Sequence, residues 1–107
     1  MYEARLAAVQ AAIRAGEFFY GLHMQRRMRA RALSRTAIAD ALLSGDPEVI
    51  EDYLHAGRGA CCLVWCRASD GRVLHVVVTY PPVPLAVTAY WPDERPHEWS
   101  VDFKRRV

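Results

Sequence analysis

The chain has 107 residues, of which 52% are hydrophobic and 24% are charged, and its formal net charge is +2. These values match an ordinary globular protein of about one domain, so we expect a single domain over residues 1–107. We divide it into a helical part over about 2–45, a sheet part over about 48–91 and a C-terminal tail over 92–107. No stretch has the roughly 18–20 apolar residues of a membrane span, and the N-terminus lacks the apolar core of a signal peptide. We therefore expect a cytoplasmic protein that does not bind membranes.

The cysteines and histidines do not form a recognisable metal-binding pattern. Cys61, Cys62 and Cys66 are odd in number and lie within one predicted strand, which favours free, buried thiols over a disulfide framework. The four histidines are scattered without the spacing of metal ligands. We expect neither a metal nor another cofactor.

The N-terminal part reads as helical. Val9 and Ile13 recur at helical spacing among alanines, which predicts a first helix over residues 2–15. Residues 17–21 are expected to form a short aromatic connector that wedges this helix against the next. A second and strongly basic helix is predicted over about 22–32.

The third helix carries the clearest boundary signals. Ser34 is a good N-cap, and Leu33 and Ile38 on either side of it can form a hydrophobic staple. Gly45 is expected just past the C-terminal end of the helix, in the position that favours glycine.

The pattern then changes to that of strands. A short edge strand is predicted over 49–53 and a second strand over 60–67. Ser-Asp-Gly at 69–71 is a strong turn signal before a third strand over 72–80, and a fourth strand is expected over 85–90. Helices followed by a meander of strands indicate an α+β fold with N-terminal helices on a mostly antiparallel four-stranded sheet.

The most informative polar feature is a stripe along the second helix. His23, Arg27 and Arg31 are spaced at i, i+4 and i+8, so they lie along one side of a helix. Residues 23–35 hold five arginines and no acid. Guanidinium groups suit bidentate binding of phosphate and histidine can transfer a proton near neutral pH, so the stripe is a candidate phosphodiester site. A solvated helix face is the alternative interpretation.

A histidine also interrupts the apolar third strand. If the loop over 81–84 places Tyr80 opposite Leu85, His75 lies opposite Tyr90 and Val77 lies opposite Thr88, so that His75, Tyr90 and Thr88 share one patch. His75 could instead be a hydrogen-bonded core residue, and Thr88 and Tyr90 could reflect ordinary β-propensity.

These segments, taken together, resemble family 4258 of the domains of unknown function, over about residues 4–99. The resemblance rests on short motifs in a fixed order: HMQRRMRARALS at 23–34, then Ile38, Leu42, Gly45 and 50–53, then CLV at 62–64, LHVV at 74–77 and VTAY at 87–90. Such proteins are similar to the RelE/ParE-type toxin superfamily. The resemblance implies N-terminal helices against a curved, four-stranded, mostly antiparallel sheet. It also implies a cognate antitoxin encoded nearby, often one with a small zinc-binding module.

The recurrent polar positions of the family fall on residues already selected from spacing: His23, Arg27, Arg31, His75, Thr88 and Tyr90. The resemblance and the residue types together suggest a toxin-like, metal-independent ribonuclease. In this hypothesis one histidine takes the proton of an RNA 2′-hydroxyl, while the other histidine or Tyr90 protonates the leaving 5′-oxygen. Arg27 and Arg31, with Thr88, bind the phosphate.

Two other functions are compatible with the sequence. ParE-type members of the same fold group inhibit DNA gyrase without cutting RNA, and here the arginine stripe would be a protein-binding face. Alternatively, the chain is an adaptor or immunity-type protein that binds a partner through Trp65, Trp91 or Trp99. We expect RNA and a cognate antitoxin as the partners of the nuclease.

Overall fold

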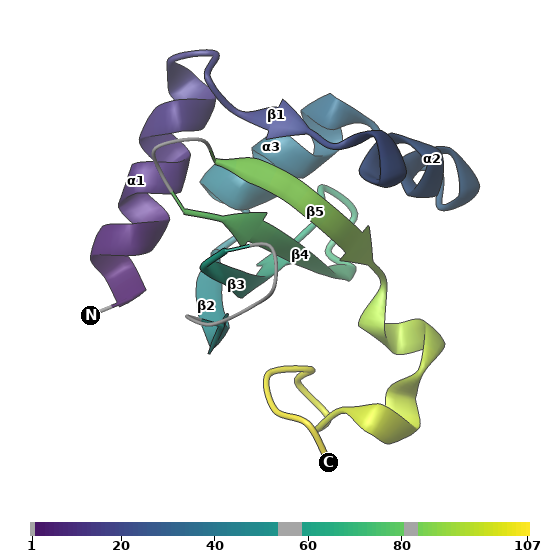
Figure 1. Ribbon diagram of the computed structural model, residues 1–107. Coiled ribbons are helices and arrows are strands. Elements are labelled where there is room, and N and C mark those ends of the chain that lie inside the picture. The colour runs from purple at the N-terminus through teal and green to yellow at the C-terminus, as the bar shows by residue number, and fades with distance from the viewer. Residues whose placement is uncertain (1, 54–58, 81–83) are drawn as a thin grey trace.

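Apart from the two-residue strand β1 (Phe19–Tyr20), the strands follow the three α-helices in the computed structural model, which describes residues 2–53, 59–80 and 84–107 (Figure 1). The elements are α1 (Tyr2–Arg14), β1 (Phe19–Tyr20), α2 (Leu22–Ala30), α3 (Arg35–Ser44), β2 (Glu48–Tyr53), β3 (Cys61–Arg67), β4 (Val73–Thr79), β5 (Leu85–Tyr90) and two short 3-10 helices, η1 (Pro92–Glu94) and η2 (Pro96–Glu98). The predicted α+β class is confirmed, and each predicted helix and strand is present within a few residues of its expected bounds. The residues at 81–83, which include most of the loop assumed for the strand pairing, lie outside the described parts.

The sheet has five strands and not four. Its order is β1-β5-β4-β3-β2, with β1 parallel to β5 and every other neighbouring pair antiparallel. The additional strand, β1, falls within the region expected to be an aromatic connector. It pairs with β5 and becomes an edge of the sheet, and the amide of Phe19 donates to the Pro84 carbonyl at 3.2 Å. A pairing of two residues has no hydrophobic periodicity of its own, so the sequence pattern could not indicate it.

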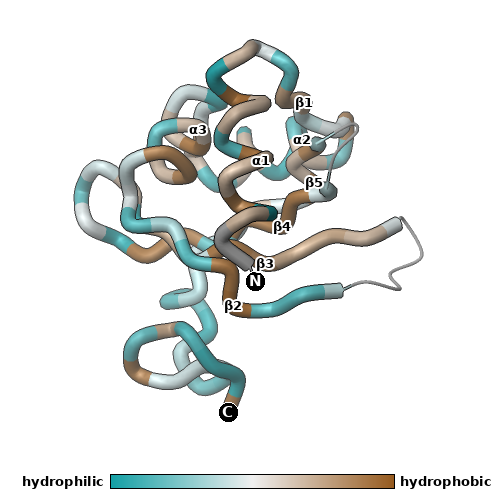
Figure 2. Tube along the Cα trace, turned by 90° about the vertical axis from the view of Figure 1, so that its left-hand side faces the viewer, coloured by the Kyte–Doolittle hydropathy of each residue, from teal (hydrophilic) through white to brown (hydrophobic). Residues whose placement is uncertain are grey.

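The three helices cover one face of the sheet and the C-terminal segment covers the other. Figure 2 shows the helices above the strands and the tail below them. On the helical face the buried cluster includes Val9 of α1, Met24 of α2 and Leu42 of α3, packed against alternate strand residues such as Val76. On the opposite face the indole Nε1 of Trp65 donates to the Asp102 carbonyl at 2.8 Å. The central strand β4 is therefore covered on both sides, which agrees with its nearly continuous run of apolar residues.

The start of α3 matches the sequence signals. At its C-terminal end the left-handed residue is Asp46 and not Gly45. The Ala37 amide donates to Ser34 Oγ at 3.0 Å, which confirms Ser34 as the N-cap. Gly45 has a φ of −92°, and Asp46 takes the left-handed conformation with a φ of 52°. Glycine at 45 is needed for close packing, because a Cβ there would lie 2.2 Å from the Arg67 carbonyl oxygen.

The basic helix ends two residues earlier than expected. α2 stops at Ala30, Arg31 is its C-cap, and Ala32 has a φ of 53°. The Leu33 amide then donates to the Met28 carbonyl at 2.9 Å, which satisfies a carbonyl at the end of the helix. Arg31 thus projects from the point where the chain leaves the helix.

Candidate functional site

Four of the six predicted site residues line one cavity. This central cavity, of about 260 Å³, lies where the C-terminal end of α2 meets the end of β5 and the tail. Arg27 and Arg31 enter from the helix, and Thr88 and Tyr90 enter from the strand. The remaining lining residues are Trp91, Pro92, Glu94, Arg95, Glu98, Trp99 and Arg106.

The guanidinium of Arg31 is only partly satisfied in this cavity. Its Nη1 atom is buried and has no hydrogen-bond partner among the described residues. Leaving a buried polar group without a partner is costly, and more so for a charged group. The main chain at this position is held independently, because Trp91 Nε1 donates to the Arg31 carbonyl at 3.3 Å. Because Nη1 is buried, the guanidinium must turn toward the cavity before an anionic oxygen there can supply the missing acceptor.

His23 lies beside the central cavity, in an adjoining groove. This His23 groove, of about 690 Å³, shares Arg27 and Arg31 with the central cavity. Arg27 Nε donates to His23 Nε2 at 2.9 Å, so the ring in this arrangement carries its proton on Nδ1. The helix therefore presents two guanidiniums between a histidine on one side and Tyr90 on the other.

His75 is the fully buried member of the predicted set. It lies opposite Tyr90, and Val77 lies opposite Thr88, so the predicted pairing is confirmed over these positions. A bulge shifts the register between Val77 and Val78, and the assumed pairing of Tyr80 with Leu85 lies beyond that bulge. His75 has no exposed surface, so a substrate in the cavity cannot contact it directly, and the expectation that it reacts with substrate needs revision.

The hydrogen-bond partners of His75 determine which ring nitrogen carries the proton. Nε2 lies 2.8 Å from the Phe103 carbonyl oxygen, and Nδ1 lies 3.3 Å from the Tyr90 hydroxyl. A carbonyl can only accept, so Nε2 must donate and Nδ1 of the neutral ring must accept. The Tyr90 hydroxyl consequently donates its proton to His75 and turns its lone pairs away from the ring.

The residues around this pair favour the neutral forms of both. Burial lowers the pKa of His75 and raises the pKa of Tyr90. Arg106 lies close enough to oppose the rise at Tyr90, and its guanidinium binds both carboxylate oxygens of Glu51, at 2.8 and 3.2 Å. Burial opposes ionisation of Glu51, but its bonds with Arg106 and Tyr53 outweigh this and lower its pKa. Glu51 thus compensates the charge of Arg106 beneath the cavity.

A comparison with protein families assigns the chain to a group. Residues 20–91 match the model described as domain of unknown function (DUF4258). The chain belongs to this family. No curated protein and no solved structure matches it. All six predicted site residues fall inside the matched region of this DUF4258 protein.

The tail contributes a wall of the cavity from outside the matched region. Trp99 packs edge-on against His75 with ring centroids 4.5 Å apart, and Arg106 stacks on Trp99 at 4.6 Å. Phe103, with a φ of 61°, supplies the carbonyl that His75 requires. Sequence reasoning named Trp99 only as a possible partner anchor and missed Phe103 and Arg106, because their contacts are long-range and their spacing shows no period.

The cysteines lie outside the lining of the central cavity. Cys61, Cys62 and Cys66 are buried and form no disulfide, and burial raises the pKa of the Cys62 thiol to about 11 and of the Cys66 thiol to about 12. Over residues 2–53, 59–80 and 84–107, no three His, Cys, Asp or Glu side chains gather as a metal site would require. Within the same ranges no helix has the length and hydrophobicity to span a bilayer. His55 lies outside the described residues.

Proposed function

We propose that this DUF4258 protein is a metal-independent endoribonuclease of the toxin type. The observation that carries the proposal is the buried Arg31 Nη1, which lacks an acceptor among the described residues and belongs to a cavity that Tyr90 also lines. A phosphodiester supplies such an acceptor, and RNA places a nucleophilic 2′-hydroxyl next to it.

The substrate phosphate binds between Arg27 and Arg31. These residues line both the central cavity and the His23 groove, so a phosphate held by them has Tyr90 on one side and His23 on the other. Thr88, also in the cavity, donates its hydroxyl to a phosphate oxygen. Two guanidiniums stabilise the additional negative charge that develops as the 2′-oxygen approaches phosphorus.

His75 acts through Tyr90. The 2′-hydroxyl gives its proton to the Tyr90 oxygen as the phenolic proton passes to His75 Nδ1, and the 2′-oxygen forms a bond to phosphorus. His75 is thereby a positioning and proton-storing residue, and Tyr90 is the catalytic group in contact with substrate. This revises the expectation that both histidines contact RNA, because His75 is buried.

His23 serves the leaving group. A phosphate that draws Arg27 away from His23 frees Nε2 to bind a proton, which the imidazolium then gives to the departing 5′-oxygen as the P–O5′ bond breaks. The products are a 2′,3′-cyclic phosphate and a 5′-hydroxyl. DNA is not cut, because it has no 2′-hydroxyl.

The proposal includes the class of toxin and its protein partner. An α+β chain with helices packed on a mostly antiparallel sheet is compatible with a RelE/ParE-like toxin, and the predicted antitoxin with a zinc-binding module would be its protein partner. A ParE-like role would use the arginines of α2 for contact with gyrase, and it leaves the oriented Tyr90–His75 pair without a use.

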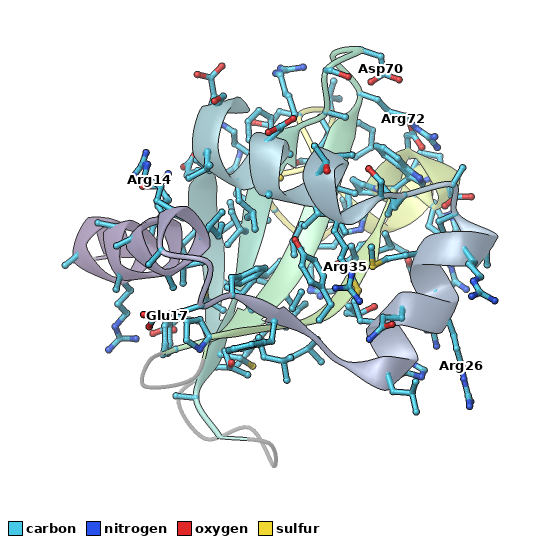
Figure 3. All side chains as sticks on the ribbon, turned by 90° about the horizontal axis from the view of Figure 1, so that it is seen from above. Arg14, Glu17, Arg26, Arg35, Asp70 and Arg72 are labelled. Carbon is cyan, nitrogen blue, oxygen red and sulfur yellow. The ribbon has the colours of Figure 1, made fainter. Side chains whose placement is uncertain are left out.

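The test is an RNA cleavage assay with the purified chain in the presence of a chelator. We expect fragments ending in 2′,3′-cyclic phosphate, an intact DNA of the same sequence, and loss of cleavage in Arg31→Ala. Arg14→Ala is the matched control, because Arg14 is exposed on α1, on the opposite side of the molecule from α2 (Figure 3). Equal activity of the two variants, or gyrase inhibition without RNA cleavage, would contradict the proposal.

A further inference from the structure

The arginines of α2 extend beyond the central cavity onto a second side of the helix. Leu22, Arg26 and Arg29 follow i, i+4 and i+7 spacing and form a stripe rotated by about 100° from that of His23 and Arg27. They line a third depression of about 370 Å³, the Leu22 groove. Its other lining residues are Gln25, Met28, Leu33 and Arg35.

Every charged residue that lines the Leu22 groove is an arginine. Its three arginines are accompanied by no carboxylate among the described lining residues. Elsewhere in the described parts, ion pairs engage Arg5, Arg72, Arg95, Lys104 and Arg106. None of those pairs involves an arginine of α2 or Arg35. A concentration of unpaired guanidiniums attracts a polyanion.

The three depressions are connected by shared residues. The central cavity and the His23 groove share Arg27 and Arg31, and the His23 groove and the Leu22 groove share Arg26. They therefore form one arginine-lined path around α2, a helix of nine residues, or about 13 Å, with Glu94 and Glu98 on the side of the tail. A flexible single strand can follow a turn this tight, whereas a duplex is stiff over the same length.

The groove also offers apolar surface. Leu22 is 69% exposed, and the buried side chain of Met28 forms part of the same lining. An apolar floor flanked by guanidiniums fits an unpaired nucleotide, whose base is apolar on its faces and whose phosphate is anionic. An acidic peptide would match the charge, but it would not account for the continuity of the path with the cavity that we assign to the phosphodiester.

We infer that the Leu22 groove binds the flanking nucleotides of a single-stranded RNA whose scissile phosphate occupies the central cavity. The inference rests on the proposed ribonuclease function for its choice of polyanion. The arginines at 26 and 29 then act on binding of long substrates and leave the chemical step unchanged.

The test compares binding of short and long probes to the 107-residue chain. The probes are 2′-O-methyl oligoribonucleotides of about three and about twelve nucleotides, which lack the attacking hydroxyl and are measured by fluorescence anisotropy. We expect the double variant Arg26→Ala, Arg29→Ala to weaken binding of the long probe about tenfold and of the short probe less than twofold. In the double variant, the slope of the logarithm of the binding constant for the long probe against the logarithm of the salt concentration should become less steep by about 1.4. Each of the two lost phosphate contacts contributes about 0.7 for a single strand.

The control is Arg14→Ala, Arg105→Ala, which removes two exposed charges outside all three depressions. An equal loss of affinity in the control, an equal effect on both probe lengths, or no binding of the long probe would overturn the inference. Competition by poly-glutamate as strong as by RNA would overturn it in favour of an acidic protein partner. If unmodified RNA is not cleaved but the length dependence is observed, the proposed catalysis fails and the binding path stands.

Discussion

The hydroxyl of Tyr90 lies 3.3 Å from Nδ1 of His75, and the other nitrogen of that ring is held 2.8 Å from a main-chain carbonyl. The carbonyl belongs to Phe103, a residue in a left-handed conformation that bulky side chains adopt rarely. Three segments distant in sequence are thus combined to set the direction of a single phenolic proton. A hydroxyl that donates its own proton to His75 has its oxygen lone pairs free to accept a proton from a ligand in the cavity.

Removing that hydroxyl should abolish most of the proposed activity. Tyr90→Phe is expected to reduce kcat/KM for RNA cleavage by a factor of about 10² to 10⁴, the range for loss of a general acid–base group. The thermal unfolding temperature should change little, because the ring remains packed. Tyr20→Phe is the matched control, since the Tyr20 hydroxyl donates to the Arg35 carbonyl outside the central cavity. Wild-type rates in Tyr90→Phe would refute the proposed proton transfer from the RNA 2′-hydroxyl through Tyr90 to His75.

The buried His75 should make the stability of the protein depend on pH. Burial lowers its pKa in the folded chain below the ordinary value of about 6.5, with Glu51 opposing and Arg106 reinforcing this effect. As the pH falls below about 6.5, the unfolded chain binds a proton that the folded chain does not, so the free energy of unfolding falls. Urea unfolding at pH 7 and pH 5 measures the loss.

His75→Gln is the comparison for this measurement, because its side-chain amide can still donate to the Phe103 carbonyl. The variant should lose less stability between pH 7 and pH 5 than the wild type, and carboxylates common to both proteins cancel in the difference. Because the proposed proton transfer needs an unprotonated His75, the same lowered pKa means that the cleavage rate should begin to fall only below pH 6.5. Parallel pH profiles of wild type and variant would show that His75 titrates identically in both states.

Local patterns identified most of the fold. The N-cap at Ser34 and the pairing of His75 with Tyr90 were predictable because capping chemistry and the two-residue period of strands act over a few positions. The parallel strand β1 was not, because its partner lies more than sixty residues away. The end of α2 was placed too late, because the left-handed turn at Ala32 has no glycine to mark it.

The site was only partly visible in the sequence. The spacing of Arg27 with Arg31 placed both on one side of a helix, and strand alternation placed Thr88 with Tyr90, so these four were correctly grouped. Burial of His75 depends on Trp99 and the rest of the tail, which pack on it through tertiary contacts. Nothing in the local sequence of β4 distinguishes a histidine that faces a cavity from one covered by a distant segment.

The junction between α3 and β3 provides a test of the fold itself. In Gly45→Ala the new methyl group would lie 2.2 Å from the Arg67 carbonyl oxygen, so the two main chains must separate. The Arg67 amide donates to the Gly45 carbonyl at 2.8 Å, and this bond would be strained as well. We expect a loss of about 1–3 kcal/mol in the free energy of unfolding, measured by urea denaturation.

Gly21→Ala is the matched control for this substitution. Gly21 has a φ of −62°, and a Cβ there would have its nearest contact at 3.9 Å, so alanine fits without strain. Its effect on stability should remain within about 0.5 kcal/mol. A Gly45→Ala variant as stable as Gly21→Ala would mean that the approach of α3 to β3 is looser than described.

His23 is the residue whose two possible roles can be separated by one substitution. Its Nε2 accepts from Arg27 Nε at 2.9 Å, and the amide oxygen of His23→Gln can accept in the same way but cannot donate a proton to a leaving group as an imidazolium does. If His23 is the general acid, His23→Gln should lower kcat about 10²-fold or more with little change in KM. Retention of activity in His23→Gln together with its loss in His23→Ala would show that the ring only orients Arg27. His97→Gln controls for loss of an exposed imidazole, because His97 lies outside the lining of the central cavity and of the His23 groove, and it should leave both kinetic constants unchanged.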